Sequence, residues 1–387
     1  MSYIFTQFLD LLPRYEFQKI VNKYNGDYKV RNFNCWNQLA CMIYGQLKGE
    51  KSLREIDRSI NSQLSKLYHI GIKECPKSTL GDANEKRDFR IYEEFAKYLM
   101  VITQNEYKNT DLSLDITSAV YALDASTVDL CLNLFDWAKF RRRKGAVKLH
   151  TMIDLKGNIP VFLNITDGKT HDIKAVGELP IEANAIYVMD RGYVDFSWLM
   201  KFNQASCFFV TRLKTNINYR RICSNSIDHN VGIKSDQEIK LVSNRLKERY
   251  PLNLRRVSFH DGITKKNLVF LTNNFNLPAI IIADIYKARW QIELFFKWIK
   301  QNLKIKTFYG YSQNAVKTQL WIAMIVYLLI SLIKERYKVD MAPSAMLHLI
   351  DANLFENKPL LLLFLKATKQ TKNKTKIEQL NLFDFLS

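Results

Sequence analysis

Residues with chemically useful side chains recur at helical spacing around position 290. Three of these residues follow Tyr286 by three, seven and fourteen positions: Arg289, Glu293 and Lys300. Because each residue turns an α-helix by about 100°, these offsets place all four side chains on one stripe about 60° wide. Arg and Lys bind phosphate, Tyr offers a hydroxyl and Glu can hold a metal ion. The stripe therefore predicts one acid held among three phosphate-binding groups.

The same helix has a second, apolar face about 90° from the stripe. Its members are Ile292, Phe295, Phe296, Ile299 and Leu303. Such a face packs on a sheet while the polar stripe lines a cleft. The alternative is an amphipathic helix whose charged face is merely solvated.

Two aspartates follow apolar, strand-like runs. Asp124 follows Ala119–Leu123, and Asp190 follows Ala185–Met189. Sites of α/β sheets form at strand ends, so strand order can bring the two carboxylates together. Like charges so close destabilise a fold unless a cation lies between them. With Glu293 as a third oxygen ligand, the set predicts Mg²⁺ or Mn²⁺, although most strand-terminal aspartates only make turns.

Three carboxylates of this kind can hold two divalent ions. Such ions, about 3.5–4 Å apart, activate the attacking oxygen and stabilise the leaving oxygen during in-line displacement at phosphorus. The predicted reaction class is therefore phosphodiester chemistry.

Composition points to a polyanionic partner. The 387 residues include 57 Lys+Arg against 38 Asp+Glu, for a formal net charge of +19. This excess favours nucleic acid as the partner, through counterion release. A hydrophobic content of 47% excludes wholesale disorder and supports a sizeable core in two or three domains. The longest apolar run, Trp321–Ile333, is too short to span a bilayer and predicts a core helix.

The cysteines give no sign of a metal or disulfide framework. All six are scattered, without a C-x-x-C motif or a Cys/His cluster at zinc spacing. We expect buried, reduced thiols in a cytosolic protein. The N-terminus lacks a basic-then-apolar signal pattern, so we expect a cytoplasmic protein with no membrane partner.

The first hundred or so residues are predicted to be helical. Helices are expected after Pro13 and from about Cys35 to Leu47. Ser52-Leu-Arg-Glu55 and Thr79-Leu-Gly-Asp82 fit the capping box that begins a helix. A helix-turn-helix that reads DNA is one interpretation of this module, but the break between about residues 70 and 78 exceeds the usual short turn. The alternative is a solvated charged surface, and both stay open. The basic side chains concerned are Arg54, Arg58, Lys77, Lys86, Arg87 and Arg90.

From about Thr117 the pattern becomes strand-like. Three strands form a meander that includes Lys148–Ile153 and Ile159–Ile165, and two further strands alternate with helices. The order β-β-β-α-β-α-β predicts an α/β fold with a mixed sheet and helices on both faces. Residues 214–276 break this rhythm with short β-like segments, so we expect a β-rich insertion there. The lysine-rich stretch of residues 366–376 predicts a solvated tail that adds nonspecific DNA affinity.

Taken together, the three acids resemble those of the DDE transposases of bacterial insertion sequences. The closest resemblance is to the branch with the signature Y-x2-R-x3-E-x6-K, insertion-sequence family four, which Tyr286, Arg289, Glu293 and Lys300 match at every place. Asp190-Arg-Gly-Tyr193 resembles the motif around the second Asp. Asp124-Ala-Ser-Thr resembles the first, with Ala125 where a hydroxyl residue is commoner. The resemblance covers nearly the whole chain.

The resemblance implies a ribonuclease-H-like core in which Asp124, Asp190 and Glu293 are catalytic and hold two Mg²⁺, with Mn²⁺ as substitute. Water would first cut the 3′ end of the element, and the released 3′-hydroxyl would attack the opposite strand to give a hairpin that is reopened before joining to target DNA. Tyr286, Arg289 and Lys300 would bind the terminal phosphates. Partners would be double-stranded DNA, as terminal inverted repeats and as target, and a second copy in a homodimer, with no small-molecule cofactor. The protein would act at the bacterial nucleoid.

The predicted domains follow from these expectations. A helical DNA-binding and dimerisation domain spans residues 1–112, and the catalytic core spans 113–213 and 277–340. The β-rich insertion spans 214–276, and a C-terminal helical segment with the basic tail spans 341–387.

Six further residues are candidates for contact with DNA. Arg141, Arg142, Arg143 and Lys144 lie between the first two strands and are suited to tracking a DNA backbone, although a solvated hairpin tip is the alternative. Trp290 and Trp298 flank the polar stripe and are candidates for stacking on an unpaired base, with core or rim packing as the alternative.

Two other functions stay open at this point. One is a non-catalytic DNA-binding regulator derived from a transposase, which would need no carboxylates facing phosphate. The other is a different ribonuclease-H-like DNA nuclease, which would cut branched DNA without joining strands.

Overall fold

The fold was determined as a computed structural model, which forms two compact units. One unit comprises Met1–Glu106 with Trp298–Ser387, and the other comprises Tyr107–Lys297. The residues described are 2–68, 71–72, 74–112, 114–131, 133–141, 144–177 and 179–365. The lysine-rich stretch of residues 366–376 lies outside the described residues.

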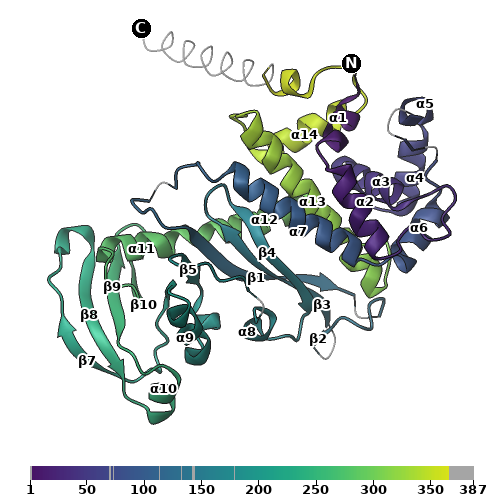
Figure 1. The fold of residues 1–387 in the computed structure, drawn as a ribbon. Helices are drawn as coiled ribbons and strands as arrows, with labels where there is room; N and C mark the ends of the chain where they lie inside the picture. The colour runs from purple at the N-terminus through teal and green to yellow at the C-terminus, as the bar shows by residue number, and fades with distance from the viewer. Residues whose placement is uncertain are drawn as a thin grey trace, which may run out of the picture. The chain divides into compact units, whose positions relative to one another are not determined.

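The first unit is helical and is built around one long apolar helix. Helix α13 packs against α7 and α3, and α14 packs against α13 and α3 (Figure 1). The helices are α1 (Ile4–Asp10), α2 (Arg14–Lys23), α3 (Cys35–Lys48), α4 (Leu53–Asn61), α5 (Leu64–Leu67), α6 (Lys77–Lys86), α7 (Arg90–Glu106), α13 (Gln313–Arg336) and α14 (Pro343–Asn353). This unit includes residues after Lys297 that the sequence analysis divided between the core and a C-terminal segment. The domain boundaries given there stay a prediction.

Helix α13 matches the prediction of a core helix at Trp321–Ile333. By length and composition it is the one helix of the described chain that is suited to crossing a membrane, and 94% of its most apolar stretch is buried inside the protein. Its surroundings in the helical unit account for its apolar character.

The predicted helix starts were partly right. Ser52 caps α4, because its side chain accepts a hydrogen bond of 3.2 Å from the Glu55 N–H. The start predicted at Thr79 is wrong, since α6 begins at Lys77 directly after Pro76. Pro76 offers no side-chain cap, and the Lys77 N–H donates instead to Asp57 Oδ2 at 3.1 Å.

The second unit is an α/β unit with one large sheet. The strands are β1 (Val120–Leu130), β2 (Lys139–Arg141), β3 (Lys144–Asp154), β4 (Ile159–Asp167), β5 (Ile186–Met189), β6 (Phe208–Arg212), β7 (Tyr219–Ser224), β8 (Ile233–Leu241), β9 (Leu254–Asp261) and β10 (Lys266–Thr272). The helical segments are α8 (Asp172–Ala175), η2 (Arg191–Tyr193), α9 (Phe196–Gln204), η3 (His229–Val231), α10 (Asn244–Arg249), α11 (Ala279–Ala288) and the start of α12 (Trp290–Asn302).

Strand order confirms the predicted fold class. The sheet runs β2-β3-β1-β5-β6-β10-β9-β8-β7, with β4 beside β3. Strands β1, β5 and β6 are parallel, whereas β3 and β4 are antiparallel to their neighbours. This is the mixed sheet that the sequence analysis predicted, and helices α8 and α9 pack on one face while α11 packs on the other. The β-rich insertion continues the same sheet, because β10 pairs with β6.

The prediction that the cysteines are buried thiols was right only in part. All six are free thiols, and Cys35, Cys41, Cys75 and Cys207 are buried as expected. Cys131 and Cys223 are exposed, which corrects the expectation of burial for those two. Cys223 lies on the edge strand β7, where one side of the strand has no neighbour.

Candidate active site

Asp124 and Asp190 occupy matching positions on neighbouring parallel strands. The last residues paired between β1 and β5 are Leu123 and Met189, and each aspartate is the next residue of its strand or turn. Asp190 keeps an extended backbone, with φ −74° and ψ 162°. Since side chains alternate along extended chain, both carboxylates leave the sheet on the same face.

The strand that carries Asp124 is longer than predicted. The expected end at Leu123 is wrong, because β1 continues to Leu130 while pairing with β3 alone. Only the pairing with β5 ends at Leu123. Asp124 therefore has a fixed backbone on one side and an open sheet edge on the other.

The third acid, Glu293, lies in the first turn of α12, just after a break between two helices. The sequence predicted one helix through Tyr286 and Lys300, but α11 ends at Ala288 and α12 begins at Trp290. At the junction the Arg289 N–H bonds to the Tyr286 carbonyl, and the Ile292 N–H bonds to the Arg289 carbonyl. These bonds span three residues instead of four, so the chain tightens there. The predicted apolar face is confirmed, because all five of its members are buried.

Arg289 connects two of the acids. Its guanidinium lies 2.7 Å from Glu293 Oε1 and 3.4 Å from Asp124 Oδ2. The Tyr286 hydroxyl donates to Asp190 Oδ1 at 3.4 Å, and its ring packs on Phe270. The structure thus brings together Asp124, Asp190, Glu293, Tyr286 and Arg289.

Burial raises the pKa of Asp124 to about 6. The Ala125 N–H, which donates to Asp124 Oδ1 at 2.8 Å, and the Arg289 guanidinium oppose this rise. The negative charges of Glu293 and Asp190 add to it. Asp124 is therefore an acid whose ionised form needs additional positive charge.

A divalent ion is the charge that the sequence analysis predicted. Three carboxylates form an oxygen-only donor set that fits Mg²⁺ or Mn²⁺. In the described part of the chain, however, no three His, Cys, Asp or Glu side chains lie close enough together to hold one ion. The Arg289 guanidinium lies against both Asp124 and Glu293. The donor set fits a cation, and Arg289 provides one in this arrangement.

Sequence reasoning missed a polar cluster on the other face of β3. Asp172 lies 2.6 Å from Lys148 Nζ and 3.4 Å from His150 Nδ1, in surroundings where the His150 side chain is fully buried. Burial also raises the pKa of Tyr193, with Asp172, Asp124 and Asp190 as its charged neighbours. The signal in the sequence that could have pointed to Tyr193 was its position three residues after Asp190.

The other predicted site residues of α12 are Trp290, Trp298 and Lys300. The boundary of the α/β unit falls between Lys297 and Trp298 within α12, and Lys300 follows it, half-buried. Trp298 packs edge to face on Tyr327 at 5.1 Å, whereas Trp290 is 57% exposed. Their roles stay predictions.

The basic run between the first two strands is described only through its backbone. Arg141 pairs with Lys144 across the β2–β3 turn. Arg142 and Arg143 lie outside the described residues, so the predicted DNA contact of this run stays a prediction.

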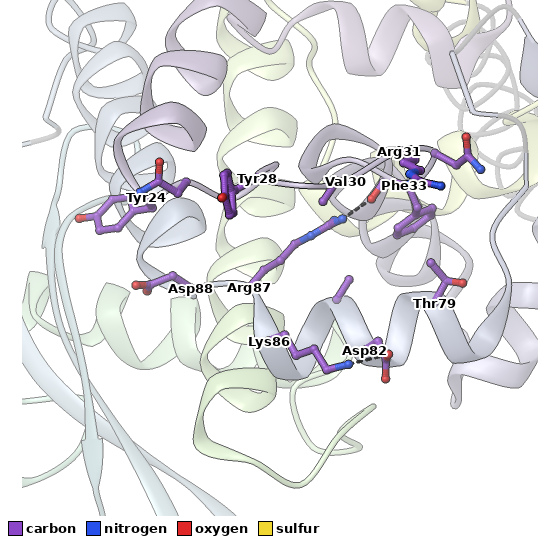
Figure 2. Close-up of a pocket in the computed structure, with 14 residues that line it drawn as sticks. Tyr24, Tyr28, Val30, Arg31, Phe33, Thr79, Asp82, Lys86, Arg87 and Asp88 are labelled. Carbon is purple, nitrogen blue, oxygen red and sulfur yellow. Dashed lines mark hydrogen bonds and ion pairs between the residues drawn. The ribbon is translucent and has the colours of Figure 1, made fainter.

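A separate cavity of about 820 Å³ opens in the helical unit. Figure 2 shows Arg87 reaching across it to the carbonyl of Phe33, and Lys86 paired with Asp82 at 2.8 Å. Arg87 also donates to the Asn34 carbonyl and to Gln38. Lys86 is thus paired with a carboxylate, whereas Arg87 is held by neutral oxygen atoms and keeps its charge.

Comparisons with known proteins show the family to which the chain belongs. Residues 117–329 match the family described as Transposase DDE domain, and residues 1–73 match one described as Domain of unknown function (DUF4372). A putative transposase of Sinorhizobium fredii, y4zB, is 32% identical over 72% of this chain and 77% of its own length. A probable transposase for insertion sequence element IS5377 of Geobacillus stearothermophilus is 29% identical over 64% of this chain and 65% of its own.

Among solved structures, the cryo-EM structure of a piggyBac transposase synaptic complex with hairpin DNA is similar with a TM-score of 0.41 and 11% identity, over 93% of this chain and 86% of that one. The match to the transposase domain covers more than half of the sequence, and the Sinorhizobium relative is matched over most of its length. The chain therefore belongs to the DDE transposases of insertion sequences.

Proposed function

We propose that this transposase cuts the ends of its own insertion sequence and joins them to target DNA by phosphodiester hydrolysis and transesterification. The observation that carries the proposal is the contact of Arg289 with both Asp124 of β1 and Glu293 of α12, next to Asp190, which follows β5 and accepts a hydrogen bond from Tyr286. A DNA-binding regulator would have no need of three carboxylates at one sheet edge.

Members of the family generally use divalent metal ions. Asp124, Asp190 and Glu293 would hold two Mg²⁺, with Mn²⁺ as substitute. When bound, the ions would activate the attacking oxygen and stabilise the leaving oxygen at phosphorus. The chain itself supplies the three carboxylates, and it supplies cations and a hydroxyl for the phosphates.

Arg289 would then exchange partners. Its planar guanidinium can bind two oxygens of a phosphate as well as it binds the carboxylates of Asp124 and Glu293. Tyr286 would remain a donor, because burial raises the pKa of its hydroxyl. Lys300 would add a point charge near the terminal phosphates.

The reaction would proceed as a series of displacements at phosphorus. The oxygen of water attacks phosphorus at the end of the element, and the bond from phosphorus to the 3′ oxygen breaks, leaving a 3′-hydroxyl and a 5′-phosphate. The 3′-hydroxyl would next attack phosphorus in the opposite strand, where the bond from phosphorus to the 3′ oxygen of the flanking DNA breaks, so that a hairpin forms and the flanking DNA leaves with a 3′-hydroxyl. A second water would reopen the hairpin by breaking the new bond between phosphorus and the 3′ oxygen. The restored 3′-hydroxyl would attack phosphorus in target DNA, and the broken target strand would keep a 3′-hydroxyl. A homodimer would hold the two ends together.

The test is cleavage of an oligonucleotide that carries the inverted-repeat end from the DNA flanking the gene. Nicking should need Mg²⁺, and Asp124→Asn, Asp190→Asn and Glu293→Gln should each abolish it while DNA binding persists. Asp129→Asn is the matched control, because Asp129 is an exposed residue of the same strand as Asp124. It should cut like the parent protein.

Each other outcome has a meaning. Undiminished cutting by any of the three variants would refute the assignment of that acid. Binding without metal-dependent cutting by the parent protein would favour the regulator. Cutting of branched DNA without strand joining would favour a different nuclease.

A further inference from the structure

One sheet face of the β-rich insertion is polar over the part that holds Arg256, whereas Ile239 and Leu241 of the same face are buried. Register pairs Arg256 with Gln237, Ser258 with Ser235, and Arg221 with Ile239. Paired residues share a face, and that face alternates along each strand. Arg221, Arg256, Ser235, Gln237 and Ser258 therefore lie on one side of β7–β9, and all five are partly or fully exposed.

Arg256 has neutral partners. One of its terminal nitrogens donates to Ser235 Oγ at 3.0 Å and to Gln237 Oε1 at 3.1 Å. The guanidinium lies over the Tyr219 ring at 5.6 Å, and its buried Nε has no hydrogen-bond partner among the residues that the structure describes. No described carboxylate forms an ion pair with it. Arg256 is thus a half-buried cation that is held in place without being neutralised.

Its neighbour Arg255 shows the contrast. Arg255 points to the opposite face, is buried, and pairs with Asp236 at 2.8 Å. It also donates to the carbonyls of Asn274 and Leu277. The charge of Arg255 is satisfied inside the protein, so stability explains it. No such explanation covers Arg256.

The charge of the whole insertion has the same sign. Residues 214–276 contain twelve Lys or Arg against five Asp or Glu, so about a sixth of the chain holds seven of its nineteen net positive charges. A held guanidinium, hydroxyl groups and an exposed second arginine on one face are the donors that a phosphodiester backbone accepts.

We infer that this face, centred on Arg256 and Arg221, binds the phosphate backbone of duplex DNA outside the catalytic acids. The inference rests on the proposed function and deepens it, since it assigns a DNA-contacting role to the insertion. Arg256 contacts one phosphate, and Arg221 on the edge strand contacts a neighbouring one. The contact is independent of base sequence.

The test is equilibrium binding of the full-length protein to a random-sequence DNA duplex in EDTA. Binding is measured by fluorescence anisotropy over a range of salt concentrations. Each phosphate contact contributes about 0.9 to the slope of log affinity against log salt. Arg256→Gln should therefore lower the slope by about 0.9 and weaken binding at every salt concentration. Arg256→Lys should keep the slope and lose affinity, because the charge remains and the fork is lost.

Lys240→Gln is the matched control. Lys240 is an exposed cation of the same sheet, but its neighbours Ile239 and Leu241 are buried on the Arg256 face, so the Lys240 side chain lies on the opposite face. It should change the slope less than Arg256→Gln does. The inference would be overturned if the two glutamine variants gave equal slopes. It would also be overturned if Arg256→Gln kept both the slope and the melting temperature of the parent protein. Either result would leave the proposed function intact. Parent protein that binds no DNA at all would overturn both. Preference for RNA duplexes over DNA would refute the occupant named here.

Discussion

Replacing Asp124 by asparagine should stabilise the metal-free protein while it abolishes cutting. Burial raises the pKa of Asp124 from 3.8 to about 6. A carboxyl group with a raised pKa in the folded state binds its proton more tightly there than in the unfolded chain. Its contribution to stability is full below about pH 4 and is lost as pH rises through about 6.

The size of the effect follows from the same values. One pKa unit corresponds to about 1.4 kcal/mol, so the ionised carboxylate costs the folded protein about 3 kcal/mol at pH 7. Asparagine carries no charge and avoids this cost. Arg289 keeps a partner in the variant, because Glu293 lies 2.7 Å from its guanidinium.

The assay is urea unfolding in EDTA at several pH values between 4 and 7, with Asp129→Asn as control. The free energy of unfolding of Asp124→Asn should equal that of the parent near pH 4 and exceed it by about 3 kcal/mol at pH 7. Adding Mg²⁺ should stabilise the parent and not the variant. A variant less stable than the parent at pH 7 in EDTA would refute the reasoning, since Arg289 would then outweigh burial.

Two further outcomes follow from other contacts. Without DNA, the Arg289→Gln variant should bind Mn²⁺ at least about tenfold more tightly than the parent protein, as measured by calorimetry. The reason is that a unit charge about 4 Å away in a partly buried site repels another of the same sign by about 4 kcal/mol. Unchanged affinity would contradict competition between Arg289 and the ion. Asp236→Ala should lower the free energy of unfolding by about 3–5 kcal/mol, because it leaves Arg255 charged and buried, whereas Asp284→Asn, in an exposed pair with Lys287, should cost about 1 kcal/mol or less.

Much of the fold could be predicted because its signals are local. Apolar runs fixed the places of the strands that end beside Asp124 and Asp190, and spacing gave the buried face of α12. What local patterns could not give was partnership between strands. The sheet continues from β6 into β10 through pairing between residues about sixty positions apart, and no short pattern encodes that neighbour.

The site shows the same division. Residue types and spacing selected Asp124, Asp190 and Glu293, but they placed Tyr286 and Glu293 on one helix, because helical periodicity does not reveal the tightened turns at Arg289. The pairing of Arg289 with Asp124 joins residues 165 positions apart. The cluster of Lys148, His150 and Asp172 was missed for a similar reason, since it depends on where α8 folds back onto β3.

The pairing of β10 with β6 also bears on how such proteins can lose or gain segments. If residues 214–276 were removed, the hydrogen-bonding groups of β6 that face β10 would be left without partners along an exposed margin. A bare margin of this kind invites joining to other chains and the formation of aggregates. Any relative that shortened this region would have to shield β6 in some other way, so the segment protects the solubility of the catalytic sheet as well as enlarging it.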